Sequence, residues 1–183
     1  MKKILLINSQ DYYGWIAISI HWLSVLFIIG LFFLGITMVE LDYYSPWYHK
    51  APFIHKSLGL LFAFLLLLRI IWRVLNQTPN VLSQSKGIRR LSHWVHISFY
   101  FLMGFLVISG YLIASADDKA IEVFNWFSIP GFNLGIENQE DIAGEMHEII
   151  GWIIIILGSL HASMALKHHF VDKDATLRRM LGL

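Results

Sequence analysis

Residues 142–167 read IAGEMHEIIGWIIIILGSLHASMALK, and this stretch decides the fold. It is longer than the roughly 20 predominantly apolar residues that a helix needs to cross a bilayer. It also contains two histidines, His147 and His161, although ionisable side chains at membrane depth are costly and rare. The sequence therefore predicts a membrane-spanning helix whose histidines serve a function.

Three further segments are equally long and apolar, at roughly residues 13–38, 52–76 and 91–114. Composition agrees, because 56% of the 183 residues are hydrophobic and only 15% are charged, against about 25% charged in soluble domains. We predict an all-α membrane protein, a four-transmembrane-helix bundle forming one domain over residues 1–183. Within the long loop 115–141, the aromatic stretch 124–130 either lies along the bilayer surface or caps the bundle.

Charge is distributed unevenly between the two ends of this bundle. Of the 14 basic residues, 11 fall in the two tails, the second loop or the end of the second helix beside it. Of the 13 acidic residues, 10 fall within residues 40–42 or 117–148. Because basic residues favour the cytoplasmic side, both termini are expected there. The apolar run 4–7 is too short for a signal peptide, and a net charge of +1 gives no reason to expect a nucleic-acid partner.

The nine histidines sort by depth into pairs. His147 and His161 are 14 residues apart, which places them within about 40° of one helix face and about 21 Å apart along it. His55 matches the depth of His147 on the outside, and His21 matches His161 on the inside. Haem iron in electron-transfer proteins takes two axial ligands, often neutral imidazole. These four histidines are therefore predicted to ligate the iron of two haem b groups.

Glycines accompany these histidines at helical spacing. Gly144, Gly151 and Gly158 recur every seven residues, and Gly59 follows the histidine of the second helix by four. Small residues at this spacing often pack one membrane helix against another. Because two histidines lie on the same helix face as the first three glycines, we favour a second interpretation, in which a flat macrocycle lies against the helix backbone.

Several polar residues gather near the inner pair. Arg69 is suited to haem propionates or a quinone head group, because guanidinium binds such groups through two hydrogen bonds, whereas Arg73 is expected to reach the lipid phosphates. His93 and His96 have three possible roles. They could supply the inner haem ligand in place of the first-helix histidine, contact a haem propionate or line a substrate site. We take His93 as a haem contact and assign Arg69, His96 and His168 to a quinone site.

Six short motifs, in order along nearly the whole chain, resemble the bacterial cytochrome b561 family. They are Ile18–Leu23, Ile54–Gly59, Leu91–His96, Met146–Glu148, Leu160–Ala162 and the ending Lys167–Phe170 with Asp174 and Leu177–Met180. The resemblance implies a bacterial inner-membrane protein with two b-type haems that exchanges electrons with quinone. In one branch of that family, superoxide from the periplasm is oxidised and ubiquinone is reduced.

The expected function is therefore electron transfer from a periplasmic one-electron donor, best taken as superoxide, to ubiquinone or another quinone. Lys50, Lys56 and His49 could draw an anion towards the outer haem, or be ordinary interfacial side chains. The loop 115–141 departs from that branch. One alternative is a membrane anchor and relay subunit for a partner dehydrogenase or hydrogenase. Another, a histidine-lined metal carrier, is disfavoured because the chain has no cysteine and no carboxylate-rich path within the spans.

Overall fold

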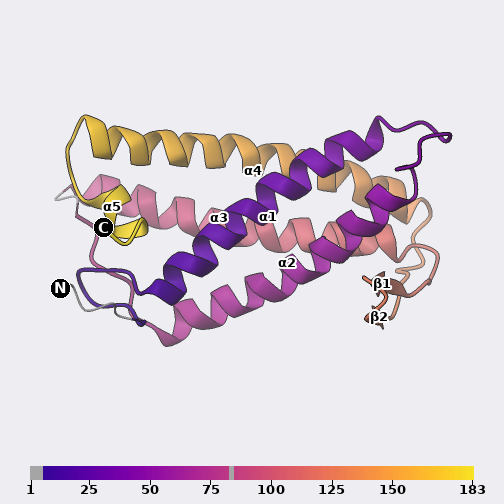
Figure 1. The fold of residues 1–183 in the computed structure, drawn as a ribbon, viewed down its shortest axis with the longest axis horizontal. Helices are drawn as coiled ribbons and strands as arrows, with labels where there is room; N and C mark the ends of the chain where they lie inside the picture. Colours follow the sequence, from indigo (N-terminus) through magenta and orange to yellow (C-terminus); the bar gives the residue numbers. More distant parts are fainter. Residues whose placement is uncertain (1–5, 83–84) are drawn as a thin grey trace.

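The fold is a bundle of long helices, described for residues 6–82 and 85–183 of a computed structural model. The helices are α1 (Trp15–Val39), α2 (Lys50–Leu75), α3 (Lys86–Ala114) and α4 (Gln139–Phe170), lying along the long axis (Figure 1). Each of the four is long and apolar enough to cross a membrane. The chain is therefore a multi-pass membrane protein. Lys2 and Lys3, counted above as basic tail residues, lie outside the described residues.

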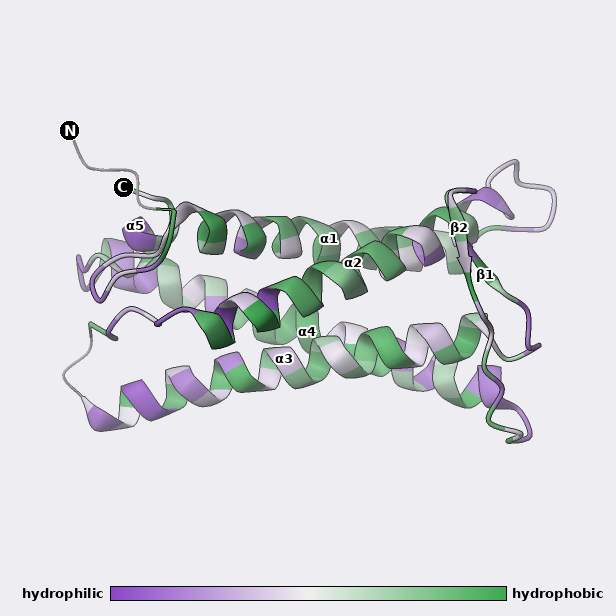
Figure 2. Ribbon diagram, turned by 90° about the horizontal axis from the view of Figure 1, so that it is seen from below, coloured by the Kyte–Doolittle hydropathy of each residue, from purple (hydrophilic) through white to green (hydrophobic). Residues whose placement is uncertain are grey.

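Two helices extend beyond the apolar segments that predicted them. α3 begins at Lys86 rather than near residue 91, and α4 runs from residue 139 to 170 rather than 142 to 167. The added turns are polar: α4 has Glu140 and Asp141 in its first turn and Lys167, His168 and His169 in its last. Those charges suit the positive and negative ends of a helix dipole. The apolar pattern thus marks the middle of each helix, while hydrophilic residues, purple in Figure 2, gather towards the helix ends.

Consecutive helices pack on one another, α1 on α2, α2 on α3 and α3 on α4. Within the described residues, α4 makes no comparable backbone contact with α1 or α2. The buried core lies where the neighbours meet, and its members are Phe62, Leu65 and Leu66 of α2, Met103 of α3 and Ile154 of α4. Most other large apolar side chains are exposed. Such a surface suits lipid, which needs no polar covering.

At one end of the bundle, here called the hairpin end, the long loop forms an antiparallel pair of strands, β1 (Ile121–Val123) and β2 (Phe127–Ile129). Phe124 and Asn125 have positive φ, and Trp126 N–H donates to the Val123 carbonyl at 2.9 Å, as in a type I′ turn. The fully buried Ser57 of α2 accepts a hydrogen bond from Phe124 N–H at 3.2 Å. Of the two interpretations of residues 124–130, the capping one therefore describes this folded loop.

At the other end, here called the tail end, three parts of the chain are tied together. The short helix α5 (Thr176–Met180) follows α4, and Trp22 of α1 donates its Nε1–H to the Met180 carbonyl at 2.8 Å. Arg179 donates to the carbonyl of Asn80, in the α2–α3 loop, at 2.8 Å. Asn80 N–H in turn donates to the Gln10 carbonyl at 2.9 Å. The N-terminal segment, the α2–α3 loop and α5 thus close this end.

Candidate functional site

The hairpin-end histidine pair consists of His55 of α2 and His147 of α4. Their ring centroids are 6.2 Å apart and the rings are inclined at 71°. Two imidazoles that share one metal ion, with metal–nitrogen distances of about 2.0–2.1 Å, have centroids about 6 Å apart. The spacing of this pair therefore fits two axial ligands of one haem iron.

Hydrogen bonding fixes the tautomer of His147. Its Nδ1 lies 3.0 Å from the carbonyl oxygen of Leu106 and 3.0 Å from the hydroxyl of Ser109, both on α3. Because a carbonyl can only accept, Nδ1–H donates to Leu106 and the lone pair of Nε2 is left for a metal. A ligating histidine ordinarily donates its other N–H in this way. The sequence offered one signal for Ser109, a small polar residue inside an apolar span, and the interpretation above missed it.

Both rings of this pair lie against glycine backbone. A Cβ added at Gly110 would come within 3.0 Å of His147 Cε1, and one added at Gly35 within 3.4 Å of His55 Cε1. His55 Nδ1 is buried and has no hydrogen-bond partner among the described residues. Such a buried atom is costly unless the ring has another role, which agrees with ligation through this imidazole. Neither glycine was singled out from the sequence.

The glycines that the sequence did single out lie elsewhere. A Cβ added at Gly59, Gly144, Gly151 or Gly158 would meet no atom within 4 Å. These glycines therefore do not hold a neighbouring helix in close contact. Three of them lie on α4, which also lacks close backbone contact with α1 and α2. Room beside both α4 histidines fits a flat macrocycle held between α4 and the first two helices.

The tail-end histidine cluster contains His21, His96 and His161. The ring of His161 contacts that of His96, with centroids 5.4 Å apart and an inclination of 86°. His21 lies within electrostatic range of both, and its Nδ1 is 3.0 Å from a guanidinium nitrogen of Arg69. The structure thus gathers the predicted inner pair and two of the three predicted quinone residues, His96 and Arg69, towards the tail end.

The hydrogen bonds of this cluster differ from one histidine to the next. His96 Nδ1 lies 2.6 Å from the Ser92 carbonyl and must donate to it, so its Nε2 is free. Guanidinium can only donate, so His21 accepts at Nδ1 from Arg69. In this arrangement His96 already has the tautomer of a ligand, whereas His21 gains it only when Arg69 moves away.

The two arginines of α2 share one aromatic partner. The guanidinium carbons of Arg69 and Arg73 lie 5.6 Å and 5.2 Å from the ring centroid of Tyr100 on α3. Arg73 was expected to reach lipid phosphates, but it packs across this ring. Cations over aromatic faces are stabilised by the ring quadrupole, most strongly when they are partly desolvated. The pair therefore brings positive charge to the edge of the tail-end cluster.

His168 and His93 lie apart from that cluster. His168 is about 10 Å farther along α4 than His161, with its Nδ1 2.9 Å from Asp172 and 3.0 Å from Asp174 carboxylate oxygens. Burial raises the pKa of Asp174, but hydrogen bonds from Thr176 and the nearby His168 outweigh it and hold that pKa below its ordinary value. Exposed His93 lines a cavity at the start of α3 with Lys86, Arg89, Arg90 and Trp94.

The lysines of the hairpin end frame a second cavity, of about 410 Å³, between α2, α3, β1 and α4. Lys56 and Lys119 line it together with Asp117, and Lys119 pairs with Asp117 at 2.7 Å. That pairing lowers the pKa of Asp117 and raises that of Lys119. His49 lies outside the cavity, against the rings of Tyr43 and Tyr48.

Half-buried imidazoles at two depths of a membrane bundle, with no cysteine for covalent attachment, are the arrangement expected of a membrane cytochrome of the b type. Within the described residues, no group of three or more acidic or histidine side chains is placed to hold a bare metal ion.

Comparison with known proteins agrees with this class. The prokaryotic cytochrome b561 family profile matches residues 12–183. The chain is 45% identical over 176 residues to "Cytochrome b561 homolog 2" of Escherichia coli (strain K12), covering 96% of this chain and 94% of that protein. It is 28% identical over 175 residues to "Probable superoxide oxidase CybB" of Yersinia pestis, covering 92% and 95%. The chain belongs to the prokaryotic cytochrome b561 family of membrane electron-transfer proteins, and this family implies binding of haem b.

Proposed function

We propose that this protein, as a single domain with two haem b groups, carries electrons across the bacterial inner membrane from superoxide to quinone. The observation that carries the proposal is the pair His55 and His147, whose spacing and tautomer suit one haem, at the opposite end from the cluster around His161. Most basic residues lie towards the tail end, so this end would face the cytoplasm and the hairpin end the periplasm.

We assign His55 and His147 to one haem, and His21 and His161 to the other. The inner assignment rests on helix packing, because α1 and α4 lack close backbone contact whereas α3 and α4, which carry His96 and His161, pack directly. A macrocycle needs separated helices on its two faces. Arg69 would release His21 and bind the haem carboxylates instead, because guanidinium groups bind carboxylates strongly. His93 would lie on the far side of those carboxylates.

Haem b, when bound, supplies a one-electron redox centre, and the side chains determine access and proton supply. At the hairpin end, the cavity is lined by Asp117, Glu122 and Glu140 as well as by Lys56 and Lys119, and Lys119 is paired with Asp117. Lys56 would therefore be the side chain that draws a small anion inward against the surrounding acidic field. Two superoxide ions would leave as two molecules of oxygen and give up two electrons. Those electrons, with two protons taken from the cytoplasmic side, convert one quinone to its quinol.

We place the quinone site beside the tail-end cluster, with Arg69, His96 and His168 as its polar residues. Arg69 can donate to a quinone oxygen, whereas His96 Nε2 is an acceptor in this tautomer and would accept from the hydroxyl of the quinol. His168, whose Nδ1 lies beside the carboxylates of Asp172 and Asp174, would relay protons from the cytoplasmic side to this site. In this assignment His168 delivers protons and His96 contacts the quinone head group.

The alternative is an anchor and relay subunit for a partner dehydrogenase or hydrogenase. The exposed rings of Tyr43, Tyr44 and Trp47 at the hairpin end favour it, because aromatic side chains are enriched where proteins associate. In that case the partner enzyme, and not a small anion, would supply the electrons.

Enzymatically generated superoxide tests the proposal on the purified protein in vesicles that contain ubiquinone. We expect about two haem b per chain in a pyridine haemochrome assay. Superoxide should reduce them, and quinol should form. Superoxide dismutase should abolish both signals. Reduction that persists with the dismutase, or that needs a co-purified dehydrogenase, would support the relay function instead.

Two single variants distinguish the proposed roles of His21 and His96. His21→Ala is expected to lower the haem content from about two to about one per chain, because an axial ligand is lost. His96→Ala should keep both haems and their reduction by superoxide, but slow reoxidation by quinone by about 10²-fold, as for the loss of a side chain that positions the head group. Haem loss in His96→Ala with retention in His21→Ala would reverse the two assignments.

A further inference from the structure

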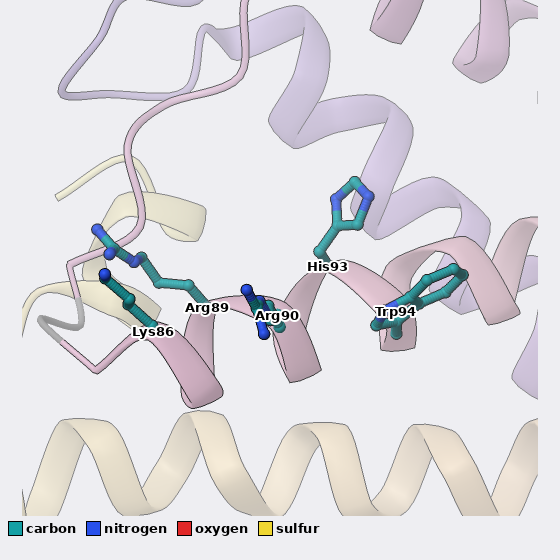
Figure 3. A pocket seen from close by; sticks show the side chains of 5 residues that line it. All are labelled: Lys86, Arg89, Arg90, His93 and Trp94. Carbon is teal, nitrogen blue, oxygen red and sulfur yellow. The ribbon is translucent and has the colours of Figure 1, made fainter.

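The first turns of α3 carry a cluster of basic side chains, of which the proposed electron-transfer site uses only His93. Lys86, Arg89, Arg90 and His93 follow one another at the i, i+3, i+4, i+7 spacing of a single helix face. With Trp94 they line a cavity of about 270 Å³ (Figure 3). All five side chains come from α3, and in this view α4 passes along the side of α3 away from His93.

The lysine and the two arginines of this cluster have no ion-pair partner in the described part of the chain. The first turn of α3 also holds no acidic residue. Lys86 and Arg90 are like charges at i and i+4, a spacing that destabilises a helix. The positive end of the α3 dipole adds to the repulsion. An anion in the cavity would relieve both effects.

The surroundings of the cavity indicate what kind of anion fits. The next apolar side chains of α3 are exposed, Leu91 by 64% and Trp94 by 63%, and they lie where the apolar segment of this helix begins. Aromatic side chains at this level favour the head-group region. Cations directly followed by exposed apolar side chains match a phosphodiester that carries acyl chains, and basic cavities of this kind bind anionic lipid head groups.

We propose that Lys86, Arg89, Arg90, His93 and Trp94 form a binding site for the phosphodiester head group of an anionic phospholipid. The arginines hold the phosphate by paired hydrogen bonds, and Lys86 adds a point charge. The acyl chains lie along Leu91 and the apolar surface of α3 below it. The bound lipid neutralises the start of α3 and anchors this helix in the head-group layer.

Native mass spectrometry of the haem-loaded protein with added phosphatidylglycerol tests this site. We expect a one-to-one adduct at concentrations where phosphatidylcholine gives none. Arg89→Gln/Arg90→Gln should weaken the adduct about thirty-fold, and Lys86→Gln alone about five-fold. The matched control Lys173→Gln/Arg178→Gln removes two exposed charges near α5 and should change binding less than two-fold.

Three results would overturn the proposal. Equal weakening in the control would mean that total charge, and not the cavity, attracts the lipid. Displacement of the adduct by soluble glycerol phosphate would assign the site to a free phosphate ester. Loss of a haem signal in Arg89→Gln/Arg90→Gln would mean that these cations hold haem carboxylates. The haem spectrum also reports folding, so an unchanged spectrum with weakened lipid binding supports the lipid site.

Discussion

Replacing His147 by alanine is expected to remove one haem and leave the other, lowering the haem content from about two to about one per chain. No other described imidazole contacts His55, so nothing replaces the lost ligand. The second haem, at the tail-end cluster about 21 Å away along α4, should keep its visible spectrum. His161→Ala should give the reciprocal result. The measurement is a pyridine haemochrome assay combined with a low-temperature visible spectrum.

Ser109→Ala is the matched control for His147→Ala. It removes a hydroxyl beside His147 Nδ1 but leaves the Leu106 carbonyl that fixes the tautomer. We expect both haems to remain, with haem affinity lowered by about ten-fold, as for other outer partners of a metal ligand. A His147→Ala protein that still binds about two haems would show that His147 is not an axial ligand.

Gly110→Val is expected to remove the same haem without changing any histidine. A Cβ at Gly110 already lies 3.0 Å from His147 Cε1 and 3.3 Å from its Nδ1, and the two methyl groups of valine need more room still. The ring must therefore swing away from the Leu106 carbonyl, and the Nε2 that faces the iron moves with it. Overpacking of this kind costs about 1–3 kcal/mol in protein cores.

The comparison for Gly110→Val is Gly104→Val, the same change on the same helix. No atom lies within 4 Å of a Cβ at Gly104, so the added methyl groups displace nothing. Both variants change helix propensity equally. The Gly104 variant should bind both haems, and the difference in haem content between the two measures the steric effect at His147. Equal haem loss in both variants would mean that the glycines matter for helix flexibility only.

The long helices were predictable because a membrane span needs a continuous apolar run, which the sequence displays directly. The ends of the helices were harder to predict, since α3 and α4 begin at Lys86 and Gln139, in polar segments where hydropathy gives no signal. The hairpin β1–β2 was missed because strands of three residues are too short for an alternating pattern. Its attachment depends on one buried hydroxyl, Ser57, which looks like any other small residue in a span.

The depth of each histidine in the membrane could be predicted from the sequence, but the side chains that each ring contacts could not. Spacing along α4 gave the separation of His147 and His161, because rise per residue is constant in a helix. Which neighbour each ring meets depends on helix rotation and on the crossing of helices, neither of which the sequence states. The contacts of His161 with His96, and of His21 with Arg69, could therefore be found only in the structure.

The hydrogen bond between Trp22 and Met180 has a consequence for the order of assembly. It joins residues 158 positions apart, and Gly182 also lies against the ring of Trp15, its added Cβ 3.1 Å from Cζ2. Each helix can pack on its predecessor as synthesis proceeds, since chains are made from the N-terminus. At the tail end, the side between α1 and α4 is tied by α5 and the residues that follow it, which are synthesised after all four long helices. Until this segment has been made, that side lacks these ties and is more open to a cofactor arriving from the membrane.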